Sequence, residues 1–278
     1  MSIWFSMFLG LVQGIAEFLP ISSSGHLSIF QNFFGVDTAQ DNKLFDVLLH
    51  LGTLVSVCVV YRRDIADMFL SLFGKRSSQK RGGHQEQTES PKASRWLFFM
   101  LIVATLPLML VLPLHNKIDA LFGNTYVVGG ALIFTGLLLF LSDKIVQGRK
   151  TEKNMRLSDA LIIGVSQAVA TIPGLSRSGT TISTGMVTGL NREFAVRFAF
   201  LLSIPAVLGA NAVTLYQALK EGQQLSPVYL AGMAVAMIVG YFAISFVRSL
   251  AKKGKFGSFA FYCWVVGALT IIATLFTR

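Results

Sequence analysis

The sequence predicts an all-α polytopic membrane protein made of two repeats with inverted topology. Only 14% of its 278 residues are charged, and 53% are hydrophobic, whereas a soluble domain carries about 25% charged residues. Five uncharged runs each approach or exceed the roughly 20 residues that cross a bilayer core. These runs are 96–116, 120–142, 198–219, 222–247 and 256–277. Two other apolar segments, 3–34 and 157–190, are interrupted by proline, serine and glycine.

The positive charge of the chain is concentrated in three segments. The formal net charge of +10 would suit a nucleic-acid-binding protein. However, eight of the 24 Lys and Arg residues lie in 62–95, five in 144–156 and four in 248–255. Basic residues in short loops between apolar spans are typical of cytoplasmic loops. We therefore interpret the charge as a topology signal and expect no nucleic acid as a partner.

These basic segments fix the order of spans in a single membrane domain, 1–278, with both termini outside. The first repeat, 1–142, is predicted to contain a re-entrant hairpin at 3–34 and spans at 44–61, 96–114 and 124–142. The second repeat, 157–278, is predicted to contain a hairpin at 157–190 and spans at 196–219, 227–247 and 257–276. Because each repeat has an odd number of spans, the second copy is inverted. The segments 62–95 and 144–156 are predicted to be cytoplasmic loops.

The two interrupted segments are interpreted as helix–loop–helix hairpins, since each must return to the side from which it came. A shift of 154 residues aligns them without a gap. The identical pairs are Gly10/Gly164, Gln13/Gln167, Ala16/Ala170, Ser22/Ser176, Ser24/Ser178 and Gly25/Gly179. Paired, interrupted segments in two inverted halves are typical of a binding site near the middle of the membrane.

The first interruption, EFLPISSSGH, places reactive side chains among apolar ones. Gln13 and Glu17 are four residues apart and therefore share one helix face. An ionised glutamate in a bilayer needs a partner or a cavity. The hydroxyls of Ser22, Ser23 and Ser24 follow, and capping of the next helix is an alternative role for each of them.

A second helix is expected to begin near His26, after a turn in which Gly25 permits a positive φ. Free amide groups at a helix start form an anion site. His26 can serve as a base, an acid, a nucleophile or a ligand.

The second interruption, PGLSRSGTT, repeats this turn chemistry and adds Arg177, the only Arg or Lys between residues 157 and 191. A guanidinium offers a fixed fork of donors that suits phosphate oxygens. The alternatives are that Arg177 is a counter-ion for Glu17 or reaches to the membrane interface. Together the two interruptions supply the groups needed to hold and cleave a phosphate ester or anhydride within the membrane.

The motifs QGIAEFLPISSSGH and PGLSRSGTT resemble the paired signatures of the undecaprenyl-diphosphate phosphatases, the bacitracin-resistance phosphatases. The resemblance covers the whole chain. It implies an inner-membrane enzyme of inverted repeats that removes the terminal phosphate of undecaprenyl diphosphate at the outer, periplasmic face. This reaction would recycle the lipid carrier for peptidoglycan synthesis, maintain cell shape and give bacitracin resistance. The partners would be the polyprenyl diphosphate and membrane lipids, and a homodimer is one option for the oligomeric state.

The resemblance also implies a set of site residues and a divalent metal, Mg²⁺ or Ca²⁺. The implied catalytic residues are Glu17, Ser23, His26 and Arg177. The implied phosphate-binding residues are Ser22, Ser24, Gly25, Ser176, Arg177, Ser178 and Thr181. Glu17 is the implied metal ligand, with Gln13 as a second candidate. The family pattern permits Glu or Gln at position 13, and Gln cannot supply a second anionic ligand.

We predict that Ser23 is the nucleophile, with His26 or Glu17 taking its proton. A turn at Gly25 would bring the Ser23 hydroxyl within hydrogen-bond reach of the His26 imidazole. Two other mechanisms stay open: attack by His26 to form a phosphohistidine, and attack by metal-activated water. A different class of function also stays open, because a lipid-phosphate flippase or transporter would use the same anion site without cleaving its substrate.

Overall fold

The structure, a computed structural model, describes residues 1–33, 43–73, 91–145, 148–222, 225–254 and 256–276. Within these ranges every regular element is a helix, and the one β pairing is an isolated bridge between Lys150 and Leu190. The first half contains α1 (Ile3–Ala16), α2 (Ser23–Phe33), α3 (Lys43–Val60), α4 (Arg62–Leu72), α5 (Pro91–Met109), the 3₁₀ turn η1 (Leu112–Leu114), α6 (His115–Leu121) and α7 (Thr125–Asp143). The second half contains α8 (Leu157–Val169), α9 (Arg177–Val187), α10 (Arg192–Lys220), α11 (Pro227–Lys253) and α12 (Ser258–Phe276).

The predicted all-α membrane fold is confirmed. Five stretches of the described residues are long and apolar enough to cross a bilayer, and a sixth span is possible if α3 and α4 count as one bent span. The five are Lys92–Leu114, Thr125–Asp143, Arg192–Ala218, Pro227–Lys253 and Ser258–Phe276. Large side chains such as Phe242, Phe246 and Phe261 point outward from these helices and are more than half exposed. Such surfaces suit contact with lipid tails rather than with water.

One segment predicted as loop is helical. The predicted cytoplasmic loop 62–95 begins with α4, which leaves α3 at a bend of 72°, and it ends inside α5. The prediction missed α4 because that helix is short and carries several charges. Its apolar side is nevertheless buried, since Met68 joins the main hydrophobic cluster and α4 packs against α5. The remainder of this predicted loop, 74–90, lies outside the described residues, as does residue 34 of the first predicted hairpin.

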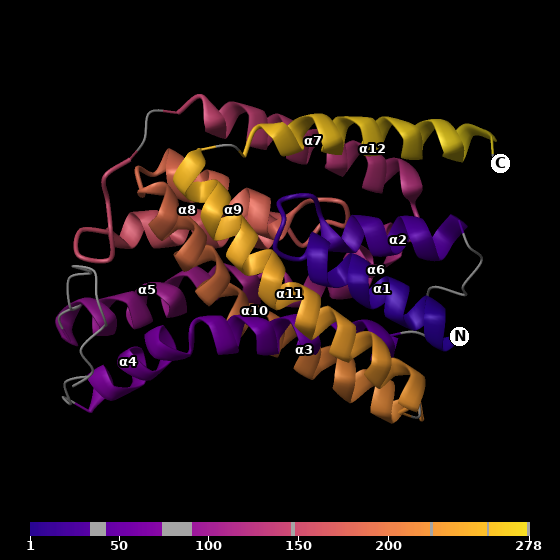
Figure 1. Ribbon diagram of the computed structural model, residues 1–278, viewed down its shortest axis with the longest axis horizontal. Coiled ribbons are helices and arrows are strands. Elements are labelled where there is room, and N and C mark those ends of the chain that lie inside the picture. The colour runs from indigo at the N-terminus through magenta and orange to yellow at the C-terminus, as the bar shows by residue number, and fades with distance from the viewer. Residues whose placement is uncertain (34–42, 74–90, 146–147, 223–224, 255, 277–278) are drawn as a thin grey trace.

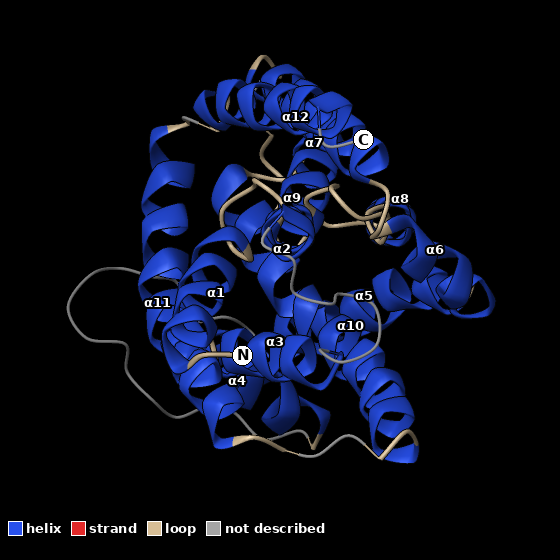
Figure 2. Ribbon diagram, turned by 90° about the vertical axis from the view of Figure 1, so that its right-hand side faces the viewer, coloured by secondary structure: helices blue, strands red, loops and turns tan. Residues whose placement is uncertain are grey.

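The two interrupted segments each form a pair of short helices, α1 with α2 and α8 with α9. Both pairs have their second helix inside the bundle, below the neighbouring helices α7 and α12 (Figures 1 and 2). The second helix of the first pair starts at Ser23, three residues earlier than expected. Ser23, Ser24 and Gly25 therefore belong to the first turn of α2 rather than to a loop.

Close backbone contacts fix how the short helices sit against the long ones. α1 packs along α11, and a Cβ atom added at Gly10 would collide with the carbonyl oxygen of Gly232. Likewise α8 packs along α5, where a Cβ atom at Gly164 would collide with the backbone of Ala104. Small residues at helix crossings permit the close approach on which membrane helices depend. The inverted relation of the two halves, and their division at 142 and 157, stay predictions.

Candidate active site

The two helix breaks are built by the same hydrogen bond. In the first, the Ser22 hydroxyl accepts from the Gly25 amide at 3.1 Å. In the second, the Ser176 hydroxyl accepts from the Gly179 amide at 3.0 Å. Capping, the alternative role considered for the serines, is thus confirmed for Ser22 and Ser176, which are 2% and 1% exposed.

The two breaks touch each other. The Ser22 hydroxyl donates to the carbonyl of Leu175 at 3.3 Å, and the Ser178 hydroxyl donates to the carbonyl of Leu19 at the same distance. A Cβ atom at Gly25 would lie 3.1 Å from the Cα atom of Gly174. Glycine at position 25 thus favours the close approach of the two breaks. The positive φ expected there belongs to Ser22 instead, at +70°.

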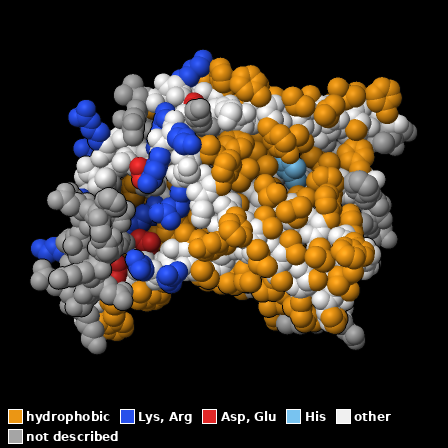
Figure 3. Space-filling view, in the orientation of Figure 1, with side chains coloured by type: hydrophobic (Ala, Val, Ile, Leu, Met, Phe, Trp, Pro, Cys, Tyr) orange, Lys and Arg blue, Asp and Glu red, His pale blue; other side chains and the backbone are white. Residues whose placement is uncertain are grey.

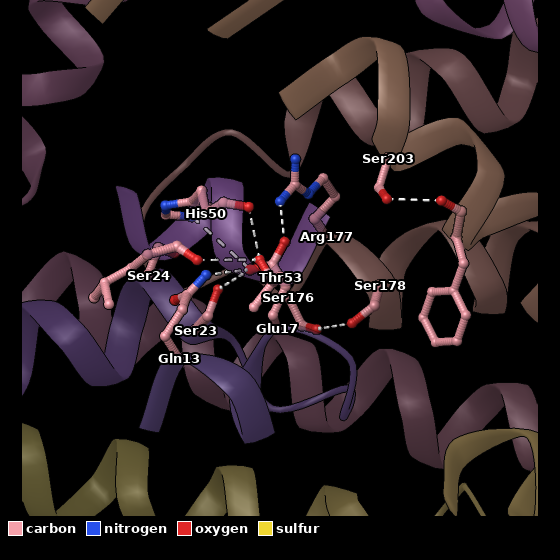
Figure 4. Close-up of polar contacts among 12 residues, drawn as sticks. Gln13, Glu17, Ser23, Ser24, His50, Thr53, Ser176, Arg177, Ser178 and Ser203 are labelled. Carbon is pink, nitrogen blue, oxygen red and sulfur yellow. Dashed lines mark hydrogen bonds and ion pairs between the residues drawn. The ribbon is translucent and has the colours of Figure 1, made fainter. Parts of the chain in front are cut away.

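Glu17 is the centre of the polar cluster between the breaks (Figure 4). Its Oε2 atom accepts from the Ser23 hydroxyl at 2.7 Å and from the Gln13 Nε2 atom at 3.1 Å. Its Oε1 atom pairs with Arg177 of the second break, and the His50 Nε2 atom of α3 lies 3.8 Å from its Oε2 atom. Side chains from α2, from α3 and from the distant helix α9 thus meet at the carboxylate that follows α1.

Burial differs across this cluster in a way that matters for chemistry. The Glu17 side chain is only 7% exposed, whereas Arg177 is 27% exposed and His50 is 24% exposed. A buried carboxylate needs a compensating charge and hydrogen bonds, which Arg177, Ser23 and Gln13 provide. Arg177 is thus a counter-ion for Glu17, and its partial exposure leaves other guanidinium donors accessible to an anion.

His26 lies apart from this cluster, so the prediction that its ring meets the Ser23 hydroxyl is wrong. The His26 Nδ1 atom lies 2.7 Å from the Ser22 carbonyl oxygen, one helical turn back. Its Nε2 atom lies 2.7 Å from the Tyr262 hydroxyl of α12, and the two rings stack at 8°. Because α2 begins at Ser23, the imidazole is held between its own first turn and α12.

The remaining predicted residues support the breaks. The Ser24 hydroxyl lies 3.3 Å from that of Ser22, and the Ser178 hydroxyl lies 3.2 Å from that of Ser176. The Thr181 hydroxyl donates to the carbonyl of Arg177 at 2.8 Å. These contacts fix the first turns of α2 and α9, from which Ser23 and Arg177 project toward Glu17.

Few side chains near Glu17 could bind a cation, but one buried oxygen atom there has no hydrogen-bond partner among the described residues. The described residues contain no group of three or more His, Cys, Asp or Glu side chains that could hold a metal. However, Gln13 is fully buried and its Oε1 atom has no hydrogen-bond partner among these residues. A buried, unpaired oxygen beside a carboxylate fits Mg²⁺, which is often held by one or two carboxylates together with substrate phosphates.

His50 is a residue that the sequence analysis missed. Its Nδ1 atom lies 2.8 Å from the carbonyl oxygen of Asp46, which orients the other ring nitrogen toward Glu17. The segment 44–61 was predicted to be a simple span. Two ionisable residues four positions apart in an apolar stretch were the available signal, since such residues within membrane segments are usually functional.

Known proteins match this chain over almost its full length. The family model described as bacitracin resistance protein BacA matches residues 6–269. An undecaprenyl-diphosphatase from Halothermothrix orenii is 40% identical over 275 residues, covering 98% of both chains. One from Desulforapulum autotrophicum is 41% identical over 276 residues, covering 98% of this chain and 99% of the relative. One from Methanobrevibacter smithii is 38% identical over 272 residues, covering 97% of both. The chain belongs to the bacitracin resistance protein family.

Proposed function

We propose that this chain is an enzyme that hydrolyses undecaprenyl diphosphate to undecaprenyl phosphate and inorganic phosphate. The observation that carries the proposal is the Glu17 carboxylate held between the Ser23 hydroxyl and the Arg177 guanidinium. Together they offer a nucleophile, a proton acceptor and a planar cation for phosphate oxygens. The names of the relatives support the same substrate.

In the proposed first step, the Ser23 Oγ atom attacks the terminal phosphorus while its proton passes to Glu17 Oε2, 2.7 Å away. The bond between that phosphorus and the bridging oxygen breaks, and undecaprenyl phosphate leaves with the bridging oxygen. In the second step, water attacks the phosphoserine phosphorus, Glu17 returns its proton to the departing Ser23 Oγ atom, and inorganic phosphate is released. The Arg177 donors that Glu17 does not use stabilise the phosphate oxygens in both steps.

We further propose that a divalent cation, Mg²⁺ or Ca²⁺, is held by Glu17 and by the Gln13 Oε1 atom. When bound, it would neutralise negative charge on the diphosphate. The unpaired state of that buried amide oxygen supports this assignment. Gln13 would contribute a neutral ligand only.

The lipid substrate explains why these polar groups lie among apolar helices. Its tail stays in the bilayer while the diphosphate enters the cluster between α1, α2 and α9. We propose that the cluster faces the outer side of the cytoplasmic membrane, which would let the enzyme recycle the lipid carrier for cell-wall synthesis and give bacitracin resistance. The distribution of basic residues supports this orientation.

Thiol labelling tests the orientation. In a variant with Cys58 and Cys263 replaced by alanine, single cysteines are introduced at Lys117 and at Ser78, a position outside the described residues. An impermeant thiol reagent added to intact cells should label the cysteine at 117 and not the cysteine at 78. The reverse pattern would contradict the proposed outer-facing site.

Phosphate release from a purified lipid diphosphate tests the activity. The detergent-purified chain should release inorganic phosphate, and the Ser23→Ala variant should release none. A folded wild-type chain that binds the lipid but never cleaves it would overturn the phosphatase proposal. That result would favour the flippase or transporter, which also uses inverted repeats and an anion site.

A further inference from the structure

A polar cavity lies away from the Glu17 cluster. It has a volume of about 510 Å³ and lies where the ends of α3, α4, α10 and α11 meet, and none of the Glu17 cluster residues lines it. Along α3, Tyr61 of the cavity and His50 of the site are separated by about 16 Å, at 1.5 Å per residue. The Phe200 ring contacts both Tyr61 and Phe18, the neighbour of Glu17. The cavity is therefore a separate site.

The cavity lining carries an excess of positive charge. Five cations line it, Arg62, Arg63, Arg197, Arg248 and Lys252, against two carboxylates, Asp64 and Glu193. One of these cations is already committed, because Arg197 pairs with Asp64 at 2.5 Å and lies 3.8 Å from Glu152. Figure 3 shows Lys and Arg side chains gathered at this end of the molecule, next to its apolar face. An anion is the complementary ligand.

A buried hydroxyl in the lining has no partner among the described residues. Tyr61 is 3% exposed, and its hydroxyl oxygen makes no hydrogen bond within the described residues. Leaving a buried hydroxyl unpaired is unfavourable, so a ligand that accepts this hydrogen bond would remove the penalty. The same residue stands at the N-cap of α4 without a side-chain cap bond. The Arg248 guanidinium lies 5.8 Å from the centre of the Tyr61 ring.

The position of the cavity indicates a lipid as the source of the anion. Arg197 is near the start of the candidate span Arg192–Ala218, and Arg248 and Lys252 are near the end of Pro227–Lys253. Span ends lie at the depth of lipid headgroups. The lining also includes Thr151, Asn191 and four apolar residues, Val60, Phe194, Val196 and Ala251. Basic residues at this depth meet lipid headgroups, which supports a lipid as the source of the anion.

We propose that this cavity binds the phosphate group of an anionic membrane phospholipid. The Tyr61 hydroxyl donates to a phosphate oxygen, and the side chains of Arg63, Arg248 and Lys252 supply the positive charge. Basic pockets between membrane helices bind anionic headgroups in this way. The site is independent of the proposed hydrolysis, because no residue of the Glu17 cluster takes part.

Thermal unfolding of the full chain, delipidated in neutral detergent, tests the proposal. Phosphatidylglycerol should raise the wild-type Tm, and phosphatidylcholine at the same concentration should not. The triple variant R63Q/R248Q/K252Q should need at least about tenfold more phosphatidylglycerol for the same shift. The matched control K92Q/R95Q/K253Q removes three cations outside the cavity and should respond as wild type does.

Tyr61→Phe tests the contribution of the hydroxyl to lipid binding while the charge of the cavity stays unchanged. Its Tm without lipid should equal or exceed that of wild type, because the lost hydroxyl has no partner, while its shift with phosphatidylglycerol should fall. The proposal would be overturned if R63Q/R248Q/K252Q and the control K92Q/R95Q/K253Q lost the Tm shift with phosphatidylglycerol equally. It would also be overturned if both Tyr61→Phe and R63Q/R248Q/K252Q kept the full wild-type shift. Saturation by inorganic phosphate, with no response to phosphatidylglycerol, would assign the cavity to a free anion and also overturn it. Phosphate release from the lipid diphosphate, measured on the same samples, verifies that each variant is folded.

Discussion

The two helix breaks have the same scaffold and different chemistry. Each has a serine hydroxyl that caps the amide three residues later, Ser22 with Gly25 and Ser176 with Gly179. The residue after the cap differs, however. It is Ser23 in the first break and Arg177 in the second, and both contact the same carboxylate.

The shift of 154 residues that aligns the two breaks also pairs their remaining polar residues, and these pairs differ. Glu17 corresponds to Thr171, whose hydroxyl donates at 2.7 Å to the carbonyl of Ala168, in the last turn of α8. Gln13 donates to Glu17, whereas neither polar side-chain atom of its counterpart Gln167 has a partner among the described residues. The comparison teaches that the backbone scaffold occurs twice, while the carboxylate and nucleophile come from one copy and the cation from the other.

A large effect is expected at the cation of the second break. Arg177→Ala should reduce turnover by about 10²–10³, the usual effect of losing one charge-stabilising group in a transition state. Arg177→Lys should also be badly impaired, because an ammonium lacks the planar fork of donors. Turnover on the lipid diphosphate is the measurement, and Arg95→Ala at the exposed start of α5 is the control. Wild-type turnover in a folded Arg177→Ala variant would make Arg177 purely structural.

Because Glu17 of the first break is the proposed cation ligand, activity should depend on a divalent cation. Chelation is expected to abolish phosphate release, and Mg²⁺ or Ca²⁺ should restore it. Glu17→Gln should inactivate the enzyme or raise the cation concentration needed for half-maximal rate, because the anionic ligand and proton acceptor are lost. Full activity in chelator would contradict both the cation and this role of Glu17.

Substitution of the two histidines should have different effects on turnover and on Tm. His50→Gln is expected to lower turnover by about 10–100-fold with little change in Tm, as losses of residues that orient a ligand do. In contrast, His26→Gln should lower turnover and Tm together, because His26 joins α2 to Tyr262 of α12. Measuring rate and Tm for both variants checks this. A drop in Tm for His50→Gln as large as for His26→Gln would remove the distinction.

The smallest effects are expected at the caps. Ser176→Ala should lower the free energy of unfolding by about 1 kcal/mol, as losses of N-caps do. At Ser22 the residue has φ +70°, a conformation that glycine adopts without strain. Ser22→Gly should therefore lower the free energy of unfolding less than Ser22→Ala does. At Ser176, where φ is −76°, glycine relieves no backbone strain, so this advantage of glycine over alanine should be absent. Denaturation of the four purified variants measures the difference.

Much of this arrangement was predictable from hydropathy and turn chemistry. Apolar runs located the long helices, and the interruptions located Glu17, Ser23 and Arg177. The start of α2 at Ser23 goes with a local bond, from the Gly25 amide to the Ser22 hydroxyl. Two other features were not predictable because they depend on packing between distant segments. Tyr262 holds the His26 ring away from Ser23, and packing against α5 stabilises the charged helix α4. His50 became part of the site only because α3 lies beside α1.

The central claim is that Ser23 of the first break attacks the substrate while Glu17 takes its proton. Acid quenching of the enzyme during turnover of a lipid diphosphate labelled on its terminal phosphate tests it most directly. We predict an acid-stable phosphoenzyme on Ser23 that is absent in Ser23→Ala. An acid-labile phosphoenzyme that persists in Ser23→Ala and disappears in His26→Ala would contradict the claim, and so would turnover without any phosphoenzyme, as expected for direct attack by water.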